Sequence, residues 1–158
     1  MILYHGSNTT IETIDLTKGR KGKDFCQGFY LTSDKTQALQ MAKTTVEREE
    51  CGVATLNCFE FDENNLYNDD IKVIFFTGYN LEWARFVRMN RSNKTNAPLH
   101  PYDIVYGPIA NDKIGLQMWR LANGYINEKR FAKEIEFLHP TFQYFFGTER
   151  AIQLLKRI

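Results

Sequence analysis

The fold is indicated most clearly by the stretch Asp24-Phe25-Cys26-Gln27-Gly28-Phe29-Tyr30-Leu31-Thr32. It passes from a glycine-containing loop into an aromatic run, which is typical of a β-strand. Ser33 or Asp34 follows at once and can cap a helix that reaches about Glu50. An aromatic ring of this strand could stack on a planar ligand, although aromatic residues in strands more commonly fill a core.

Working outward from this stretch, the chain alternates irregularly between strand and helix patterns. A basic loop with glycines covers residues 17–28, and the inner face of the following helix is expected to hold Ala38, Met41, Ala42 and Thr45. Strands are expected over residues 2–4, 53–61, 71–76, 102–106 and, as the last strand, 142–146, with a turn at Gly107-Pro108. Further helices are expected over residues 81–89, 113–122, 128–138 and after Thr148, the last with Ala151, Leu154 and Leu155 inside. Because strands and helices do not alternate strictly, we expect an α+β fold rather than a doubly wound parallel sheet.

Length and composition predict one globular domain over residues 1–158. The chain is 43% apolar and 25% charged, with a net charge of +1 that neither favours nor excludes a polyanionic partner. Its three cysteines are odd in number and form no CxxC pair, so we expect no disulfide framework and no metal site. Free thiols, the lack of a signal-peptide pattern and the lack of an apolar run of ~20 residues predict a cytoplasmic protein without a membrane partner.

Several common nucleotide sites and catalytic arrangements are missing from the sequence. There is no GxGxxG fingerprint after a strand and no GxxxxGK[ST] loop, so a Rossmann or P-loop site is not expected. Ser7 has no evident base and acid partners for a hydrolase triad.

Two other segments could carry chemistry. In Tyr4-His5-Gly6-Ser7 the imidazole could donate to a ribose hydroxyl, and the glycine would let a ligand approach the backbone. The alternative is a histidine that caps an ordinary turn. In Phe142-Gln143-Tyr144-Phe145-Phe146 the single amide could bind a sugar hydroxyl, satisfy a backbone group or point to solvent.

Together these segments resemble the ADP-ribosyltransferase superfamily, whose site is read from three strands that carry His, Tyr and usually Glu. The matching positions are His5, Tyr30 and Gln143. More closely, nearly the whole chain is similar to a bacterial family of unknown function placed in that superfamily. This similarity is carried by YHGS, DF-x-x-GFYLT, the Arg91 region, YDIVYGPIAND, and Gln143 followed by Thr148 and Ala151.

The resemblance implies two small, mostly antiparallel sheets that form a cleft flanked by helices, with NAD+ as co-substrate. His5 would hold the ribose, Tyr30 would stack on nicotinamide, and Gln143 would hydrogen-bond the nicotinamide ribose. Arg20 and Lys21 would contribute to the NAD+ diphosphate. The other residues expected at the NAD+ site are Tyr4, Gly6, Ser7, Gly28, Phe29 and Thr32.

The sequence departs from that pattern at two positions. Cys26 stands where the bacterial family's loop usually has glycine, which costs ~1 kcal/mol or more if the residue has φ > 0. Gln143 stands where most active transferases hold glutamate, so either another carboxylate such as Asp24 or Asp112 supplies the missing charge, or the reaction is slow, or the target is unusual.

The resemblance therefore predicts an NAD+-dependent ADP-ribosyltransferase that acts on a protein or nucleic acid. Such an enzyme would suit the toxin of a bacterial toxin–antitoxin pair, with a cognate antitoxin as partner. The alternatives are a catalytically weak or inactive module that binds NAD+ or ADP-ribose, and an interaction protein that keeps only the fold.

Overall fold

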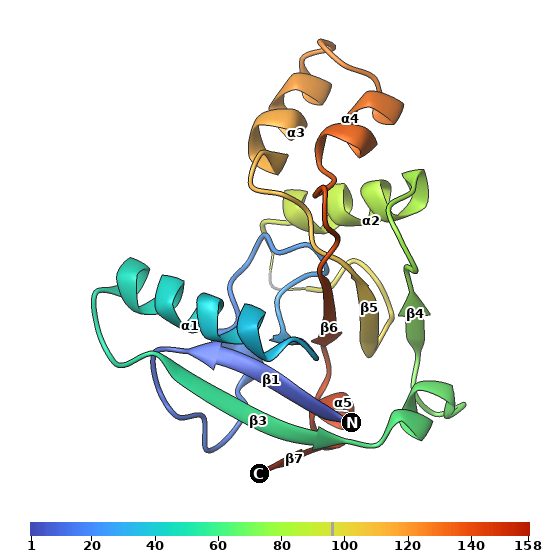
Figure 1. The fold of residues 1–158 in the computed structure, drawn as a ribbon. Coiled ribbons are helices and arrows are strands. Elements are labelled where there is room, and N and C mark those ends of the chain that lie inside the picture. The colour runs from blue at the N-terminus through green and yellow to red at the C-terminus, as the bar shows by residue number, and fades with distance from the viewer. Residues whose placement is uncertain (96) are drawn as a thin grey trace.

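The computed structural model describes residues 1–95 and 97–158, which form two β-sheets and five α-helices (Figure 1). Sheet A is antiparallel and contains, in spatial order, β1 (Ile2–Ser7), β3 (Thr55–Phe61) and β7 (Leu155–Arg157). Sheet B contains, in spatial order, β2 (Phe29–Leu31), β6 (Phe142–Phe146), β5 (Ile104–Pro108) and β4 (Val73–Phe75). Its pairs are antiparallel except β4 and β5. The expected α+β class with two small, mostly antiparallel sheets is confirmed.

The two sheets meet where β1 passes the end of β2. Tyr4 and Thr32 exchange backbone hydrogen bonds of 2.8 and 2.9 Å there. Side chains alternate across sheet B, as strand geometry requires. Phe146 and Ile104 therefore face sheet A, whereas Phe145 and Val105 face the helices on the other side.

Helix α1 (Lys35–Glu49) lies along β1 because Gly6 permits a close approach (Figure 1). A Cβ at Gly6 would lie 1.9 Å from the carbonyl oxygen of Ala38, so any side chain there would push the helix away. Asp34 caps the helix by accepting from the backbone N–H of Thr36 and Gln37. Ala42 is buried, but Met41 is 43% exposed, so the expected inner face was too wide.

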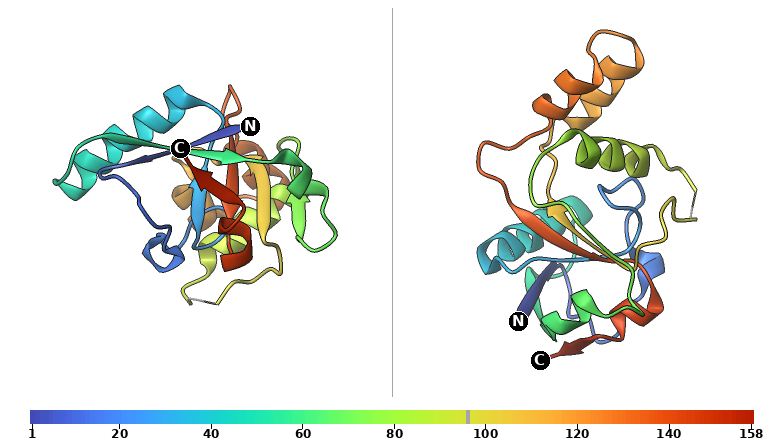
Figure 2. Two further views of the ribbon diagram at one scale, coloured as in Figure 1. Left: turned by 90° about the horizontal axis from the view of Figure 1, so that it is seen from below. Right: turned by 90° about the vertical axis from the view of Figure 1, so that its right-hand side faces the viewer.

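Three helices gather at the opposite end of the molecule from the two chain termini (Figure 2). They are α2 (Leu81–Ser92), α3 (Ile114–Ala122) and α4 (Glu128–Glu134). Trp83 of α2 is fully buried between them and sheet B, and its indole N–H donates to the Pro108 carbonyl at 3.0 Å. None of the described helices combines the length and apolar character needed to cross a membrane.

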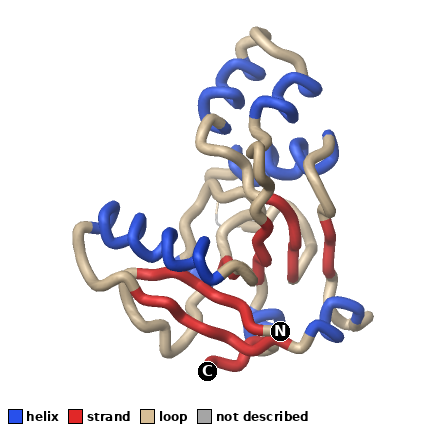
Figure 3. The backbone as a smooth tube through the Cα atoms, viewed as in Figure 1, coloured by secondary structure: helices blue, strands red, loops and turns tan. Residues whose placement is uncertain are grey.

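Three expectations about element boundaries were wrong, as the distribution of helix and strand in Figure 3 also shows. Helix α4 ends at Glu134. There the Asn111 side chain donates to the carbonyl of Glu134, the last residue of the helix, and to that of Glu136 beyond it. Pro108 ends strand β5 opposite Phe142 instead of forming a turn. The final helix, α5 (Glu149–Ile152), is a single turn. Leu155, which was expected in that helix, instead begins strand β7 and pairs with Phe61 of β3. The sequence did not suggest β7. Short 3-10 helices cover Leu16–Lys18 (η1) and Glu63–Tyr67 (η2).

Candidate functional site

His5, Tyr30 and Gln143 line one cavity of about 260 Å³ where the two sheets meet. We call it the junction cavity; one side of α1 and the loop that carries Arg20 and Lys23 form its other walls. Six of the eight other residues expected at the NAD+ site also line it, namely Tyr4, Gly6, Ser7, Arg20, Gly28 and Thr32. Lys21 does not, and neither does Phe29, which is buried beneath His5 with the two rings stacked 4.5 Å apart.

His5 presents one unused ring nitrogen. Its Nδ1 lies 2.7 Å from the Tyr30 carbonyl oxygen, which can only accept, so Nδ1 carries the proton and donates. Burial lowers the pKa of His5, and the nearby Lys23 ammonium lowers it further, so the ring is neutral at pH 7. Nε2 then has a lone pair and no hydrogen-bond partner among the described residues. It can accept from a hydroxyl, whereas the sequence had suggested that it would donate.

Tyr30 is held rigidly in the cavity wall. Its hydroxyl donates to the Cys26 carbonyl at 2.6 Å and accepts from the Phe25 N–H at 3.1 Å. Its ring packs against Phe25 and Phe145. Burial raises the pKa of the phenol well above its ordinary value, so it stays protonated. Tyr30 can offer a fixed ring to a planar ligand but has no spare hydroxyl for acid–base chemistry.

Gln143 points at Asp24, the only carboxylate that lines the junction cavity among the described residues. Its amide Nε2 lies 3.4 Å from Asp24 Oδ2. Asp24 is buried and also accepts from Arg91 Nε at 2.7 Å and from the Ala110 N–H at 3.0 Å. A Gln143 amide that donates to a carboxylate has a more negative carbonyl oxygen, which makes Oε1 a better acceptor for a ligand hydroxyl.

The structure separates the two carboxylates considered for the missing charge. Asp24 lies beside Gln143, as described. Asp112 is exposed just before α3 and lines neither large cavity, so its assignment to the site was wrong.

A cluster of cations occupies the junction cavity, and most of it was not foreseen. Lys23 is the centre: burial lowers its pKa, and Arg20, Arg91 and Arg48 lower it further, partly offset by Asp24. Lys18 also lines the cavity. Five cationic side chains therefore face one carboxylate, an arrangement that an anionic ligand would stabilise. Arg48 and Arg91 are contributed by α1 and α2, so no local pattern in the sequence connects them to the loop.

Two of the site positions determine the shape of the cavity rather than contact a ligand. Gly28 has no room for a side chain, because a Cβ would lie 2.3 Å from the Phe145 ring and 2.9 Å from the Phe146 carbonyl oxygen. Thr32 bonds the Gln37 side chain at 2.6 Å and the Phe142 carbonyl at 3.2 Å, which ties α1 to β6. These residues shape the cavity and hold its walls in register.

Cys26 has φ = +105°, one of two positive values at non-glycine residues in the described part of the chain. The expected strain is therefore present, and it is located at the residue whose carbonyl anchors the Tyr30 hydroxyl. The Cys26 side chain faces away from the junction cavity and lines a second one.

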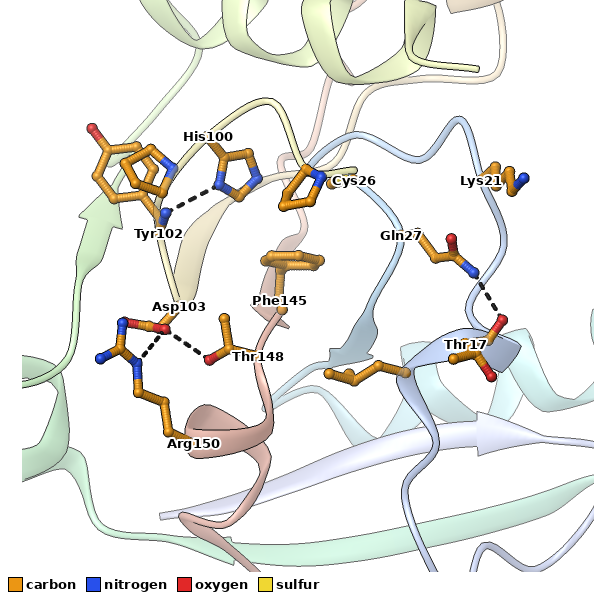
Figure 4. A pocket seen from close by; sticks show the side chains of 14 residues that line it. Thr17, Lys21, Cys26, Gln27, His100, Tyr102, Asp103, Phe145, Thr148 and Arg150 are labelled. Carbon is orange, nitrogen blue, oxygen red and sulfur yellow. Dashed lines mark hydrogen bonds and ion pairs between the residues drawn. The ribbon is translucent and has the colours of Figure 1, made fainter. Parts of the chain in front are cut away.

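That second cavity, which we call the loop cavity, is larger, about 470 Å³ (Figure 4). It lies between residues 16–27, 98–103 and 147–150 and includes Lys21, which was expected at the NAD+ diphosphate. Its histidine and its carboxylate are already fully paired. His100 Nε2 donates to the Phe25 carbonyl at 2.7 Å and its Nδ1 accepts from the Tyr102 N–H at 3.3 Å, while Asp103 accepts from Arg150, Thr148 and the Lys72 N–H. Size alone would favour this cavity, but its groups have little capacity left for a ligand.

No group of three or more His, Cys, Asp and Glu side chains in residues 1–95 and 97–158 is arranged to hold a metal ion. Compared with known proteins, the chain matches over residues 1–157 a family model described as "Protein of unknown function (DUF3990)". No curated protein and no solved structure matches it.

Proposed function

We propose that this chain, which belongs to the family described as "Protein of unknown function (DUF3990)", binds NAD+ in the junction cavity and transfers ADP-ribose to a macromolecular acceptor. The fold would then be that of an ADP-ribosyltransferase, and the acceptor a protein or a nucleic acid. The proposal includes action in the cytosol as the toxin of a toxin–antitoxin pair, consistent with free thiols at Cys26, Cys51 and Cys58.

One observation carries the proposal: two unused acceptors and a cation cluster share one cavity. His5 Nε2 and Gln143 Oε1 are suited to ribose hydroxyls, and Arg20 and Lys23 are suited to a diphosphate. The fixed ring of Tyr30 supplies a flat surface for nicotinamide. Each of these groups fits a different part of NAD+, namely the ribose hydroxyls, the diphosphate and the nicotinamide ring.

In the proposed reaction the bond between nicotinamide and ribose C1′ breaks, and its electron pair leaves with nicotinamide. A nucleophile of the acceptor bonds to C1′ and loses its proton. Positive charge develops on the ribose in the transition state, as in glycoside hydrolysis. Gln143 would orient the ribose hydroxyl, and Asp24, positioned through Gln143, would provide the negative charge that a glutamate provides elsewhere.

A second function, an NAD+-binding module with little or no turnover, is favoured by one specific contact. The Asp24 carboxylate is neutralised by Arg91 at 2.7 Å and receives a further hydrogen bond from the Ala110 N–H. A carboxylate that is already paired with a cation stabilises a developing positive charge less than an unpaired carboxylate does. Binding would then survive while the chemical step is slow.

Incubation with NAD+ labelled on the adenylate phosphate, with and without cell lysate, distinguishes these functions. The transferase releases nicotinamide and leaves label on protein or nucleic acid, and nuclease and protease digestion identifies which. The binding module retains NAD+ in equilibrium dialysis without nicotinamide release. A folded chain that neither binds nor cleaves NAD+ would be an interaction protein, and the proposal would be rejected.

A further inference from the structure

A row of aromatic side chains crosses the open part of sheet B, away from both large cavities. Phe75, Tyr106 and Tyr144 lie opposite one another on β4, β5 and β6. Phe142 stacks on Tyr106 from the same strand as Tyr144, and Tyr67 of η2 stacks on Phe75. We call these five residues the aromatic row.

The aromatic row is continuous. Ring centroids are 6.2 Å apart between Tyr67 and Phe75, 6.2 Å between Phe75 and Tyr106, and 4.7 Å between Tyr106 and Tyr144. Strands are about 4.8 Å apart, so the row extends over roughly 15 Å, the length of about five extended residues.

The aromatic row is not needed to fill a core. Tyr67, Phe75, Tyr106 and Phe142 lie outside the two apolar cores that flank sheet B, and only Tyr144 packs against one of them. Tyr67 is 78% exposed and Phe75 is 41% exposed. Tyr106, Phe142 and Tyr144 are half-buried. A connected set of large rings that are exposed or half-buried is typical of an interaction surface.

The surroundings of the row are acidic. From Glu60 to Asp70 the sequence has five acidic residues and no lysine or arginine. Asp62, Asp69 and Asp70 are exposed and take part in no ion pair within the described ranges. Burial raises the pKa of Tyr144 to about 12, and Glu63, which also pairs with the N-terminal ammonium at 3.7 Å, contributes to this rise, so the acidic segment reaches the row.

We propose that the aromatic row binds a basic, arginine-containing extended segment of a partner protein. Guanidinium groups stack on tyrosine and phenylalanine rings and are attracted by their π faces, and the acidic segment 60–70 supplies the complementary charge. Stacked rings alone would also suit a single-stranded nucleic acid, but its phosphates would be repelled by this segment.

Fluorescence anisotropy with labelled hexa-arginine tests the inference on the full chain. We expect saturable binding, at least threefold tighter than that of hexalysine, and no binding of hexaglutamate or an oligouridylate. The double variant Tyr67→Ser/Phe75→Ser should weaken hexa-arginine binding about tenfold, because it removes two cation–π contacts. Both side chains are exposed, and a thermal melt verifies that the variant is folded.

Matched controls distinguish binding at the aromatic row from nonspecific hydrophobic binding and from nonspecific charge attraction. Trp119 and Tyr125 form another exposed stacked pair, beyond sheet B at the turn between α3 and α4, and Trp119→Ser/Tyr125→Ser should leave binding unchanged. Asp69→Asn/Asp70→Asn should weaken it, whereas Glu47→Gln/Glu82→Gln should not. Equal loss in test and control variants, equal affinity for hexalysine, or tighter binding of the oligouridylate would overturn the inference.

Discussion

The two cavities have similar composition and different capacity for chemistry. Each has a histidine (His5 and His100), and each has a buried aspartate paired with an arginine (Asp24 with Arg91, Asp103 with Arg150). In the loop cavity both ring nitrogens of the histidine are used. In the junction cavity one ring nitrogen remains unused, and five cations line the wall with one carboxylate, against two cations, Lys21 and Arg150, with one carboxylate in the loop cavity. The comparison teaches that unused hydrogen bonds and uncompensated charge identify a candidate site better than cavity volume does.

The largest expected effect comes from Gln143 in the junction cavity, compared with Gln27, an amide of the loop cavity. Gln143→Ala should slow nicotinamide release roughly 100-fold, because a polarised acceptor aimed at the reacting ribose is lost, while NAD+ still binds. Gln27→Ala is the matched control, since Gln27 only donates to the Thr17 carbonyl in the loop cavity. Nicotinamide release per folded molecule measures both. A loss of stability without a change in turnover would mean that Gln143 only satisfies Asp24.

Gln143→Glu sharpens the same comparison. In the transferases that the sequence resembles a glutamate is the usual residue, but here it would place a second carboxylate beside Asp24. Like charges at that distance raise the pKa of one carboxyl and destabilise the fold. We therefore expect Gln143→Glu to release nicotinamide no faster than the native chain. A faster rate would show that the missing charge limits turnover and that Asp24 does not replace it.

The cations of the two cavities should differ in their contribution to NAD+ binding. Arg20→Gln/Lys23→Gln should weaken NAD+ binding about 30-fold by calorimetry, since each loses a charge-assisted contact with the diphosphate. Lys21→Gln, in the loop cavity, should change the affinity little. A larger effect of Lys21→Gln would place the diphosphate in the loop cavity and contradict the proposal.

Cys26 lies between the cavities and provides a stability test. At φ = +105° a glycine is unstrained, so Cys26→Gly should be more stable than Cys26→Ala by about 1 kcal/mol in urea unfolding. Both variants remove the thiol, so the difference isolates the backbone. The relaxed loop should also raise turnover through the Tyr30 anchor. Equal stability of the two variants would mean that the loop rearranges without strain.

The smallest expected effect is a difference between the two histidines in NMR titrations. Burial lowers the pKa of both His5 and His100 below the ordinary 6.5. The unfolded chain therefore binds protons first, and the free energy of unfolding falls as the pH drops below about 6.5 toward the folded-state pKa values. Bound NAD+ should lower the pKa of His5 further, because a ribose hydroxyl that donates to Nε2 stabilises the neutral ring, while the pKa of His100 stays fixed. A shift confined to His100 would contradict the assignment.

Much of the fold could be predicted from local patterns. The positions of most strands and the Asp34 cap of α1 follow from residue type and spacing, whereas the strain at Cys26 was expected from the resemblance to a family that has glycine there. Strand β7 could not be predicted, because Leu155–Arg157 has no strand pattern of its own and is ordered by pairing with β3. The same holds for the end of α4, which is set by a side chain 23 residues earlier in the chain.

The candidate site was predictable only in part. Positions matched to a known motif gave His5, Tyr30 and Gln143, which do share a cavity, while their roles stay predictions. Arg91 was missed as a partner of Asp24 because 67 residues separate them. Asp112 was assigned from charge alone, and the fold leaves it on the surface. Cavity walls built from several elements give no local signal in a single sequence.

The central claim is that the junction cavity, and not the larger loop cavity, binds NAD+. A titration of the ¹⁵N-labelled chain with NAD+, followed by two-dimensional NMR, tests it most directly, because both cavities carry backbone amides to report on binding. The account predicts saturable shifts at Gly6, Ser7 and Gly28, with Gly147 and Thr148 unchanged. Shifts centred on Gly147 and Thr148, or no shifts at millimolar NAD+, would contradict it.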